Sequence, residues 1–320
     1  MKKYCFYRIM VVLLLAIALT GCGGGGKKNS PPSSPPKIYA GVYDSMNGVG
    51  TLLKSTDGGN TVTELSGFTA NLENANISIN GIFVSNNAIY VTTSKGLAIS
   101  PDNGASFSWF DQAEQFSLIY VSETTIYAAI VDSKRLAISY DNGNNWTYKL
   151  EGYEINSIHG SESMICVATR GNGLAVSTNN GASFTFYNHS AESTSLADDS
   201  VNGVRVSNGV IYAATANGLS ISNDSGITFT TKLSGEQLSD IALSGSYVYA
   251  AADSDLWISN NGGDSFIDKP MYDDIWYLQA SGNTVYVRLF MSSLVSYDNG
   301  GSFSSVSGLD GRYVTSLFVR

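Results

Sequence analysis

The chain contains 320 residues, and its 27 acidic residues outnumber its 18 basic residues to give a net charge of −9 at neutral pH. Only 14% of the residues are charged, and the basic residues form no cluster along the sequence. Binding to nucleic acid needs lysine and arginine side chains that displace counterions from phosphates, so this charge balance excludes that class of partner.

The N-terminal segment combines a basic start with an apolar run over residues 9–19, which is too short for a comfortable membrane span. The run ends in Leu-Thr-Gly-Cys at residues 19–22. This tetrapeptide resembles the lipobox of bacterial lipoproteins, where signal peptidase cuts before a cysteine that carries diacylglycerol. The resemblance implies that residues 1–21 are a signal peptide and that Cys22 is lipidated. An ordinary secretory signal with a chance cysteine is the alternative.

A segment rich in glycine, serine and proline follows at residues 23–36. Such a composition cannot bury a core, and as a flexible coil it reaches roughly 20 Å. We therefore expect residues 22–36 to be a lipidated cysteine with a tether, and residues 37–320 to be the folded domain. Gly23, not aspartate, follows the cysteine, and resemblance to sorting rules then favours the outer membrane of a Gram-negative cell envelope. The domain is expected outside the cytoplasm, attached to the membrane only through its lipid.

Loss of the signal peptide removes three basic residues and no acidic ones, which leaves a mature net charge of −12. Cys5 leaves with the signal peptide and Cys22 takes the lipid, so Cys166 is the one thiol left in the folded domain. The sequence therefore predicts no internal disulfide, even in an oxidising compartment.

Seven copies of one turn follow along the domain, with the pattern Ser-x-Asp/Asn-x-Gly-x-Ser/Thr/Asn-aromatic, the first copy being degenerate. They are spaced by 45, 39, 38, 45, 37 and 37 residues, and each repeat holds four short apolar or alternating runs. A period near 40 with four strands per unit is typical of the blades of a β-propeller. The turns begin at Ser55, Ser100, Ser139, Ser177, Ser222, Ser259 and Ser296.

The two ends of the domain complement each other. Residues 311–320 match the first strand of a repeat, whereas the segment from Lys37 onward begins at the second strand. A last strand that joins the first blade closes the ring and leaves no open sheet edge. The sequence thus predicts an all-β, seven-bladed propeller in which the C-terminal strand completes the N-terminal blade.

The second strands share a tyrosine position, and in the fourth repeat Cys166 occupies it. We therefore expect Cys166 to be buried where other blades bury a ring, and a reactive thiol is the alternative. The tyrosines of this column are Tyr39, Tyr90, Tyr127, Tyr212, Tyr249 and Tyr286.

The repeated turn resembles the Asp box, or BNR repeat, of sialidases, sortilin-type receptors, xyloglucan-hydrolysing propellers and the photosystem II assembly factor. A structural role accounts for it: the acid or amide accepts backbone N–H bonds from two residues on, the glycine allows positive φ, and the aromatic residue fills the gap between sheets. Asparagine in two copies fits hydrogen bonding and not acid–base chemistry. Calcium binding is the alternative, but the acidic ligands and closing glutamate of a calcium loop are missing, so no metal is predicted. The box residues are Asp57, Asp102, Asp141, Asn179, Asp224, Asn261 and Asp298.

The resemblance implies that ligands approach the face opposite the Asp boxes. Two residues break their columns there: Asp240 is an acid among mostly small residues of the first strands, and Arg288 stands where other second strands carry glycine, threonine or alanine. Neighbouring aromatic residues could hold a sugar. The candidate ligand-binding residues are Tyr272, Trp276, Tyr277, Arg288 and Asp240, with Asp240 and Asp274 as candidate catalytic acids. The alternative is that Asp240 and Arg288 only pair with each other or with water.

The residues needed for sialidase activity, zinc binding or a catalytic triad are missing. No arginine lies between Arg8 and Arg135, so the arginine triad and Arg-Ile-Pro motif of sialidases are missing. His159 and His189 are the two histidines, and with one thiol they make neither a zinc site nor a catalytic triad. We expect a monomeric, non-catalytic scaffold that binds a protein partner without a cofactor. A carbohydrate-active protein is the alternative, either a polysaccharide-binding module or a glycoside hydrolase with two carboxylates, and surface adhesion is a third.

Overall fold

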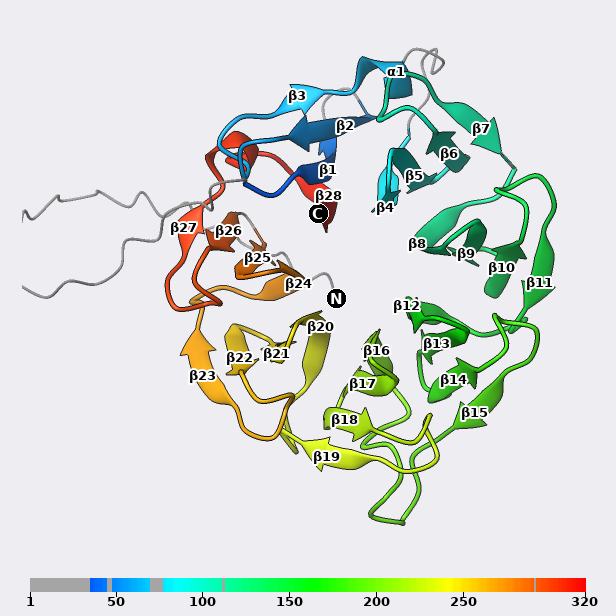
Figure 1. The fold of residues 1–320 in the computed structure, drawn as a ribbon, viewed down its shortest axis with the longest axis vertical. Coiled ribbons are helices and arrows are strands. Elements are labelled where there is room, and N and C mark those ends of the chain that lie inside the picture. The colour runs from blue at the N-terminus through cyan, green and yellow to red at the C-terminus, as the bar shows by residue number, and fades with distance from the viewer. Residues whose placement is uncertain (1–34, 45–47, 70–76, 111–112, 291) are drawn as a thin grey trace, which may run out of the picture.

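The computed structural model describes residues 35–44, 48–69, 77–110, 113–290 and 292–320. These residues form seven four-stranded antiparallel sheets that surround a central axis as blades (Figure 1). The predicted all-β, seven-bladed propeller is confirmed. The expected signal peptide, the lipidation site Cys22 and nearly all of the tether lie outside the described residues. No helix in the described ranges is long and apolar enough to cross a membrane.

Each blade runs from an inner first strand to an outer fourth strand (Figure 1). Two short helical turns, α1 (Ser66–Thr69) and η1 (Ser307–Leu309), follow the outer strands of the first and last blades. The blades comprise β28 (Val314–Val319), β1 (Ile38–Asp44), β2 (Val49–Ser55) and β3 (Thr63–Glu64); β4 (Ile79–Ser85), β5 (Ala88–Thr93), β6 (Gly96–Ser100) and β7 (Ser108–Phe110); β8 (Phe116–Ser122), β9 (Thr125–Ile130), β10 (Arg135–Ser139) and β11 (Thr147–Lys149); β12 (Ile155–Ser161), β13 (Met164–Thr169), β14 (Leu174–Ser177) and β15 (Thr185–Tyr187); β16 (Val201–Ser207), β17 (Val210–Thr215), β18 (Gly218–Ser222) and β19 (Thr230–Lys232); β20 (Leu238–Ser244), β21 (Tyr247–Ala252), β22 (Asp255–Ser259) and β23 (Ile267–Pro270); and β24 (Ile275–Ser281), β25 (Thr284–Leu289), β26 (Ser293–Ser296) and β27 (Ser304–Ser305).

The ring is closed as predicted, by β28 pairing antiparallel with β1. Ile38 lies opposite Val319, and beyond this pair the Lys37 N–H donates to the Arg320 carbonyl at 2.8 Å while the Arg320 N–H donates to the Lys37 carbonyl at 3.0 Å. The innermost strand of the first blade is therefore the last strand of the chain.

The core lies between neighbouring blades, because each sheet buries both of its faces. Second strands such as β21 are buried along nearly their whole length, and they read as continuous apolar runs where one-sided strands would alternate. Leu256 of the sixth blade, for example, packs in one cluster with Leu278 and Val287 of the seventh. Cys166 is fully buried in β13, in the column where other blades place tyrosine, which confirms that prediction.

The Asp boxes join third to fourth strands, and one serine and one acid organise each turn. The Ser100 hydroxyl donates to Asp102 Oδ1 at 2.8 Å and accepts the Gly104 N–H at 2.8 Å. Asp102 Oδ1 accepts the Ser106 N–H at 2.9 Å, and Gly104 adopts a φ of 92°. The expected bond to an N–H two residues on was wrong: the carboxylate reaches four residues on, and the serine oxygen serves the nearer N–H groups.

Asparagine reproduces this geometry in the fourth blade. Asn179 Oδ1 accepts the Ser183 N–H at 3.0 Å, and its amide Nδ2 donates to the Ser183 hydroxyl at 2.9 Å. An acid is therefore unnecessary for the turn, which supports a structural role for the boxes.

The boxes lie on the same face as the hairpins between first and second strands, since box backbones bond to those hairpins, as in Asn103 N–H to the Asn87 carbonyl at 2.8 Å. We call the opposite face, where the first strands begin, the upper face. Each first strand carries a bulge near its start, and in several blades the bulged side chain bonds the next blade. Asn202, for example, donates to the Leu238 carbonyl at 2.7 Å. In β24 the bulged residue is Trp276.

Candidate ligand-binding site

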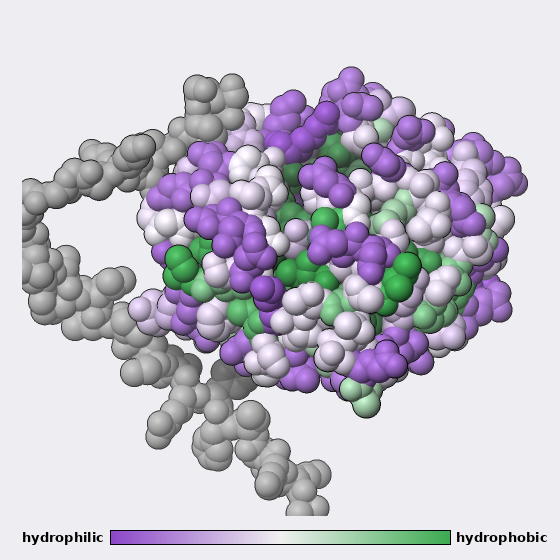
Figure 2. Space-filling view, turned by 60° about the horizontal axis from the view of Figure 1, so that its bottom comes forward, coloured by the Kyte–Doolittle hydropathy of each residue, from purple (hydrophilic) through white to green (hydrophobic). Residues whose placement is uncertain are grey.

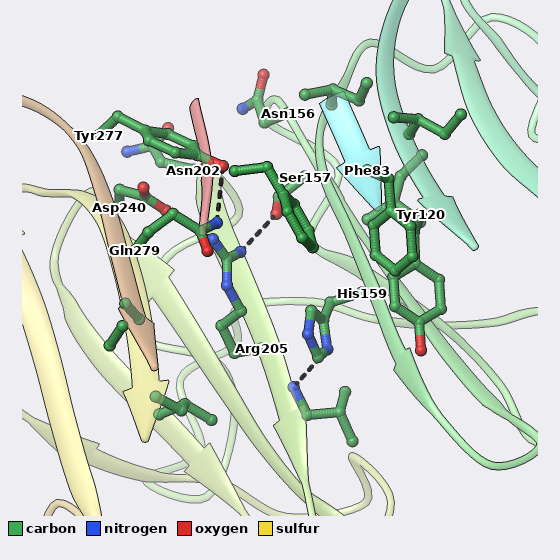
Figure 3. A pocket seen from close by; sticks show the side chains of 18 of the residues that line it. Phe83, Tyr120, Asn156, Ser157, His159, Asn202, Arg205, Asp240, Tyr277 and Gln279 are labelled. Carbon is green, nitrogen blue, oxygen red and sulfur yellow. Dashed lines mark hydrogen bonds and ion pairs between the residues drawn. The ribbon is translucent and has the colours of Figure 1, made fainter. Parts of the chain in front are cut away.

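A cavity of about 430 Å³ occupies the centre of the ring. One wall is aromatic: the Phe83 ring lies 5.2 Å from that of Phe318 and 5.6 Å from that of Tyr120, which in turn lies 5.2 Å from His159. The opposite wall is polar (Figure 3). It is formed by Asn202, Arg205, Ser239, Asp240, Tyr277 and Gln279.

Asp240 is held in this polar wall by backbone and by one arginine. Its Oδ1 accepts the Ile241 N–H at 2.8 Å, its Oδ2 accepts the Leu278 N–H at 2.9 Å, and Arg205 Nη2 lies 3.5 Å from Oδ1. Burial raises the pKa of Asp240, and Arg205 opposes that shift, as do the two N–H groups. The alternative interpretation that paired Asp240 with Arg288 was wrong, because the ionic partner of Asp240 is Arg205.

Arg205 and His159 were not predicted as site residues. Arg205 Nη1 donates to the Val204 carbonyl at 2.9 Å and contacts the Ser157 hydroxyl at 3.4 Å. His159 Nδ1 accepts the Val206 N–H at 3.1 Å, and burial together with Arg205 lowers the pKa of His159 to about 3. The imidazole is therefore neutral near pH 7, with its proton on Nε2. Its register position two pairs beyond the Asp240 column was the available signal.

A second group of side chains gathers on the upper face around Arg288, and we call Trp276, Arg288, Phe290 and Tyr313 the Arg288 cluster. The Arg288 Cζ lies 5.2 Å from the centre of the Trp276 ring and 5.4 Å from that of Tyr313. The Phe290 ring lies 5.4 Å from Trp276. Trp276 is 46% exposed, Phe290 49% and Tyr313 50%, whereas Arg288 is only 9% exposed. Two half-exposed rings thus lie against one nearly buried cation, and a third ring packs on Trp276.

The ring closure creates this cluster, since Tyr313 precedes β28 and the other members flank or belong to β24 and β25. Burial lowers the pKa of Arg288, while Tyr313 raises it. No strand pattern signals Tyr313, because it meets Arg288 only through the closed ring, and Phe290 lies beyond the end of β25. Sequence reasoning therefore missed them.

The structure divides the five predicted ligand-binding residues into three places. Trp276 and Arg288 contact each other in the Arg288 cluster, and Tyr277 and Asp240 line the central cavity. Trp276 also borders the cavity and so connects the two places. Tyr272 is 95% exposed. The candidate acid Asp274 is exposed, and its N–H donates to Asp273 at 3.0 Å.

The rest of the surface is mixed. In the view of Figure 2, polar residues cover most of the molecule and apolar residues form separate patches, not one continuous apolar face. Some other cations are paired with acids, as in Arg135 with Glu114 at 2.8 Å and Arg170 with Glu154 at 3.0 Å. Arg135 also lies over an aromatic ring, that of Tyr148 at 3.8 Å, but unlike Arg288 it has a carboxylate partner among the described residues.

No protein-family model and no curated protein matches the sequence. Solved structures do match the fold. YCF48 bound to a D1 peptide has a TM-score of 0.62 at 14% identity, over 84% of this chain and 94% of that one. The extracellular domain of BT4673, a putative hybrid two-component system from B. thetaiotaomicron, has a TM-score of 0.59 at 16% identity over 84% of this chain and 39% of that one. AFV00434, an ancestral GH74 enzyme, has a TM-score of 0.56 at 16% identity over 76% and 38%.

At these identities the likeness concerns the fold. The neighbours include the photosystem II assembly factor and glycoside hydrolase propellers, which agrees with the resemblance carried by the Asp boxes. The chain spans nearly the whole of the YCF48 structure but well under half of the other two, so the propeller alone is shared with those longer proteins.

Proposed function

We propose that this protein is an extracytoplasmic binding scaffold that presents the upper face of its propeller to a protein partner. The observation that carries the proposal is the Arg288 cluster. Tryptophan, tyrosine and arginine are the residue types that dominate binding energy at protein interfaces, where they sit in groups and not singly. Here Trp276, Phe290 and Tyr313 expose about half of each side chain around one arginine.

A propeller of this size is able to serve such a role. The YCF48 structure contains a bound D1 peptide, and that protein has the same fold over nearly its whole length. The N-terminal residues support the rest of the proposal: lipidation at Cys22 and the tether at residues 22–36 would hold the domain at the surface of the cell envelope, in a Gram-negative cell at the outer membrane.

Carbohydrate binding is the second candidate, because exposed aromatic rings can also hold sugars. Hydrolysis is a weaker proposal than binding. It needs two free carboxylates that flank a cleft, about 5–9.5 Å apart, and Asp240 has both oxygens engaged by N–H groups and faces Arg205.

The test is photo-crosslinking in cells that produce the full chain, with p-benzoylphenylalanine in place of Tyr313. We expect a discrete crosslinked species from position 313, and its loss when Trp276→Ala is added. The matched control places the crosslinker at Ile227, which is exposed in an Asp box on the opposite face. Equal crosslinking from both positions would reject the upper face as the binding surface.

Incubation with a panel of polysaccharides distinguishes carbohydrate binding from protein binding. Retention of the domain on a polysaccharide, lost in Trp276→Ala, would favour a glycan-binding module over a protein scaffold. Release of reducing sugar that Asp240→Asn abolishes without loss of folding would make the protein a hydrolase.

A further inference from the structure

We propose that Arg288 is the receptor for a carboxylate group of the partner, which it binds in the plane of its guanidinium between the rings of Trp276 and Tyr313. The inference rests on the proposed function and adds the chemistry of recognition: the partner presents either a free C-terminus or an aspartate or glutamate side chain to the upper face.

The position of Arg288 is unusual for its column. The other second strands carry glycine, threonine or alanine at this register, and Arg288 replaces a small side chain with the largest cation available. The residue as a whole is 9% exposed. No carboxylate among the described residues lies within 4.0 Å of it. Its neighbours are the rings of Trp276 and Tyr313, and the Tyr313 side chain is also a hydrogen-bond partner.

Arg205 provides an internal comparison. Its side chain is 14% exposed, and Asp240 stands 3.5 Å from it. A buried charge without a counter-ion costs stability, and proteins retain such groups chiefly where function requires them. Arg205 has its counter-ion within the chain, so the missing counter-ion of Arg288 is the feature to explain.

The geometry selects the ligand. The rings of Trp276 and Tyr313 lie beside the guanidinium, whose N–H edge matches a planar carboxylate through two parallel hydrogen bonds. Phosphate-binding sites usually gather several arginines or lysines. A single arginine in a chain with a net charge of −9 fits a monoanionic carboxylate better than a phosphate group.

The binding test uses residues 37–320 on an array of synthetic peptides, each made with a free C-terminus and as a C-terminal amide, with phosphoserine peptides included. We expect binding to a subset of peptides and at least a tenfold loss in Arg288→Gln, with partial retention in Arg288→Lys. Loss on amidation identifies a C-terminal carboxylate as the ligand, and loss on Asp→Asn or Glu→Gln identifies a side chain. Arg312→Gln is the control, because Arg312 is exposed next to Tyr313 and its loss changes the net charge equally.

Binding that survives Arg288→Gln, or an array with no carboxylate-dependent peptide, overturns the inference. The proposed function is judged separately. Crosslinking from position 313 that persists in Arg288→Gln would support the binding scaffold and reject Arg288 as the carboxylate receptor. Dominant binding of phosphoserine peptides would also reject the carboxylate.

Stability gives a readout independent of any ligand. Arg288→Met keeps the length of the side chain and removes the uncompensated charge, so we expect Tm to rise by about 2 °C or more. A fall in Tm of the same size would show that the free protein relies on the guanidinium for its own stability, which contradicts the inference.

Discussion

Arg205 and Arg288 show how one residue type acquires two roles within the same ring. Arg205 lies two register positions away from the Asp240 column, and the polar wall of the cavity holds it through Asp240, Ser157 and a backbone carbonyl. Arg288 lies at the seam between the last and first blades, beside the rings of Trp276 and Tyr313. The first arginine is paired within the chain, whereas the second is buried and has no carboxylate within 4.0 Å among the described residues.

Removing the acid of the buried pair should destabilise the domain. In Asp240→Asn, the guanidinium of Arg205 loses its counter-ion, and we expect the free energy of unfolding to fall by about 3 kcal/mol. Denaturant unfolding followed by tryptophan fluorescence measures the change.

The double variant Arg205→Met with Asp240→Asn should recover part of this loss, because it no longer leaves a buried charge unpaired. Asp274→Asn is the matched control, since Asp274 is exposed and we expect a change within about 0.5 kcal/mol. An Asp240→Asn variant as stable as the parent chain would show that the pair contributes little.

At the scale of the element, the Asp-box turn is a local unit whose side-chain hydrogen bonds are made within the turn itself, and it recurs in every blade. The serine hydroxyl, the acid and nearby backbone N–H groups form hydrogen bonds with one another within a few residues, as in the Ser100–Ser106 turn. The hydroxyl and N–H of Ser106, then the Ser100 hydroxyl, lower the pKa of Asp102 to about 2. The ionised acid is the hydrogen-bonded form, so the turn couples folding to pH.

The sign of this coupling follows from the lowered pKa. The contribution of Asp102 to stability is fully present above its ordinary pKa near 3.8 and is lost as the pH falls through about 2. We therefore expect Tm to fall between pH 4 and pH 2, with a shallower fall in Asp102→Asn, because asparagine keeps the bonds without titrating. Scanning calorimetry across this range tests both variants, and Asn179→Asp should steepen the same fall. Parallel pH profiles for all three chains would contradict the assignment.

At the scale of the whole molecule, stability depends on a pairing between the two ends of the domain. β28 is the inner strand of the first blade, and the backbones of Lys37 and Arg320 bond to each other. Clusters on both sides of the seam include residues from this blade, such as Val314 and Leu317 with Tyr286 of the last blade. The closure is thus a packing unit and not only a hydrogen-bonded edge.

A circular permutant and a C-terminal deletion distinguish the contribution of ring closure from that of the order of the chain. A circular permutant that joins residue 320 to residue 37 by a short linker and opens the exposed hairpin at Asn172 keeps every blade, and we expect it to fold with a Tm close to that of the parent domain. Deletion of residues 312–320 should instead expose the edge of β1 and give aggregation on size-exclusion chromatography. A truncated chain that remains monomeric and unfolds cooperatively would show that closure is dispensable.

The sequence was sufficient for the architecture, since the turn at Ser55 through Ser296 recurs with every blade and marks its register. It also identified Asp240 and Arg288 as exceptions to their columns. It could not assign their partners, because Arg205 meets Asp240, and Tyr313 meets Arg288, across blade boundaries that a single repeat does not encode. The reach of the box carboxylate was mispredicted for a different reason: serine competes successfully for the nearer N–H groups.

The seam also has a consequence for the order of synthesis. Tyr313 is made after every other member of the Arg288 cluster, and it directly precedes the strand that closes the ring. A nascent or prematurely terminated copy therefore has neither a closed propeller nor a complete wall around Arg288. Competence to bind through this surface should arise only with the final residues of the domain, so unfinished copies cannot occupy a partner.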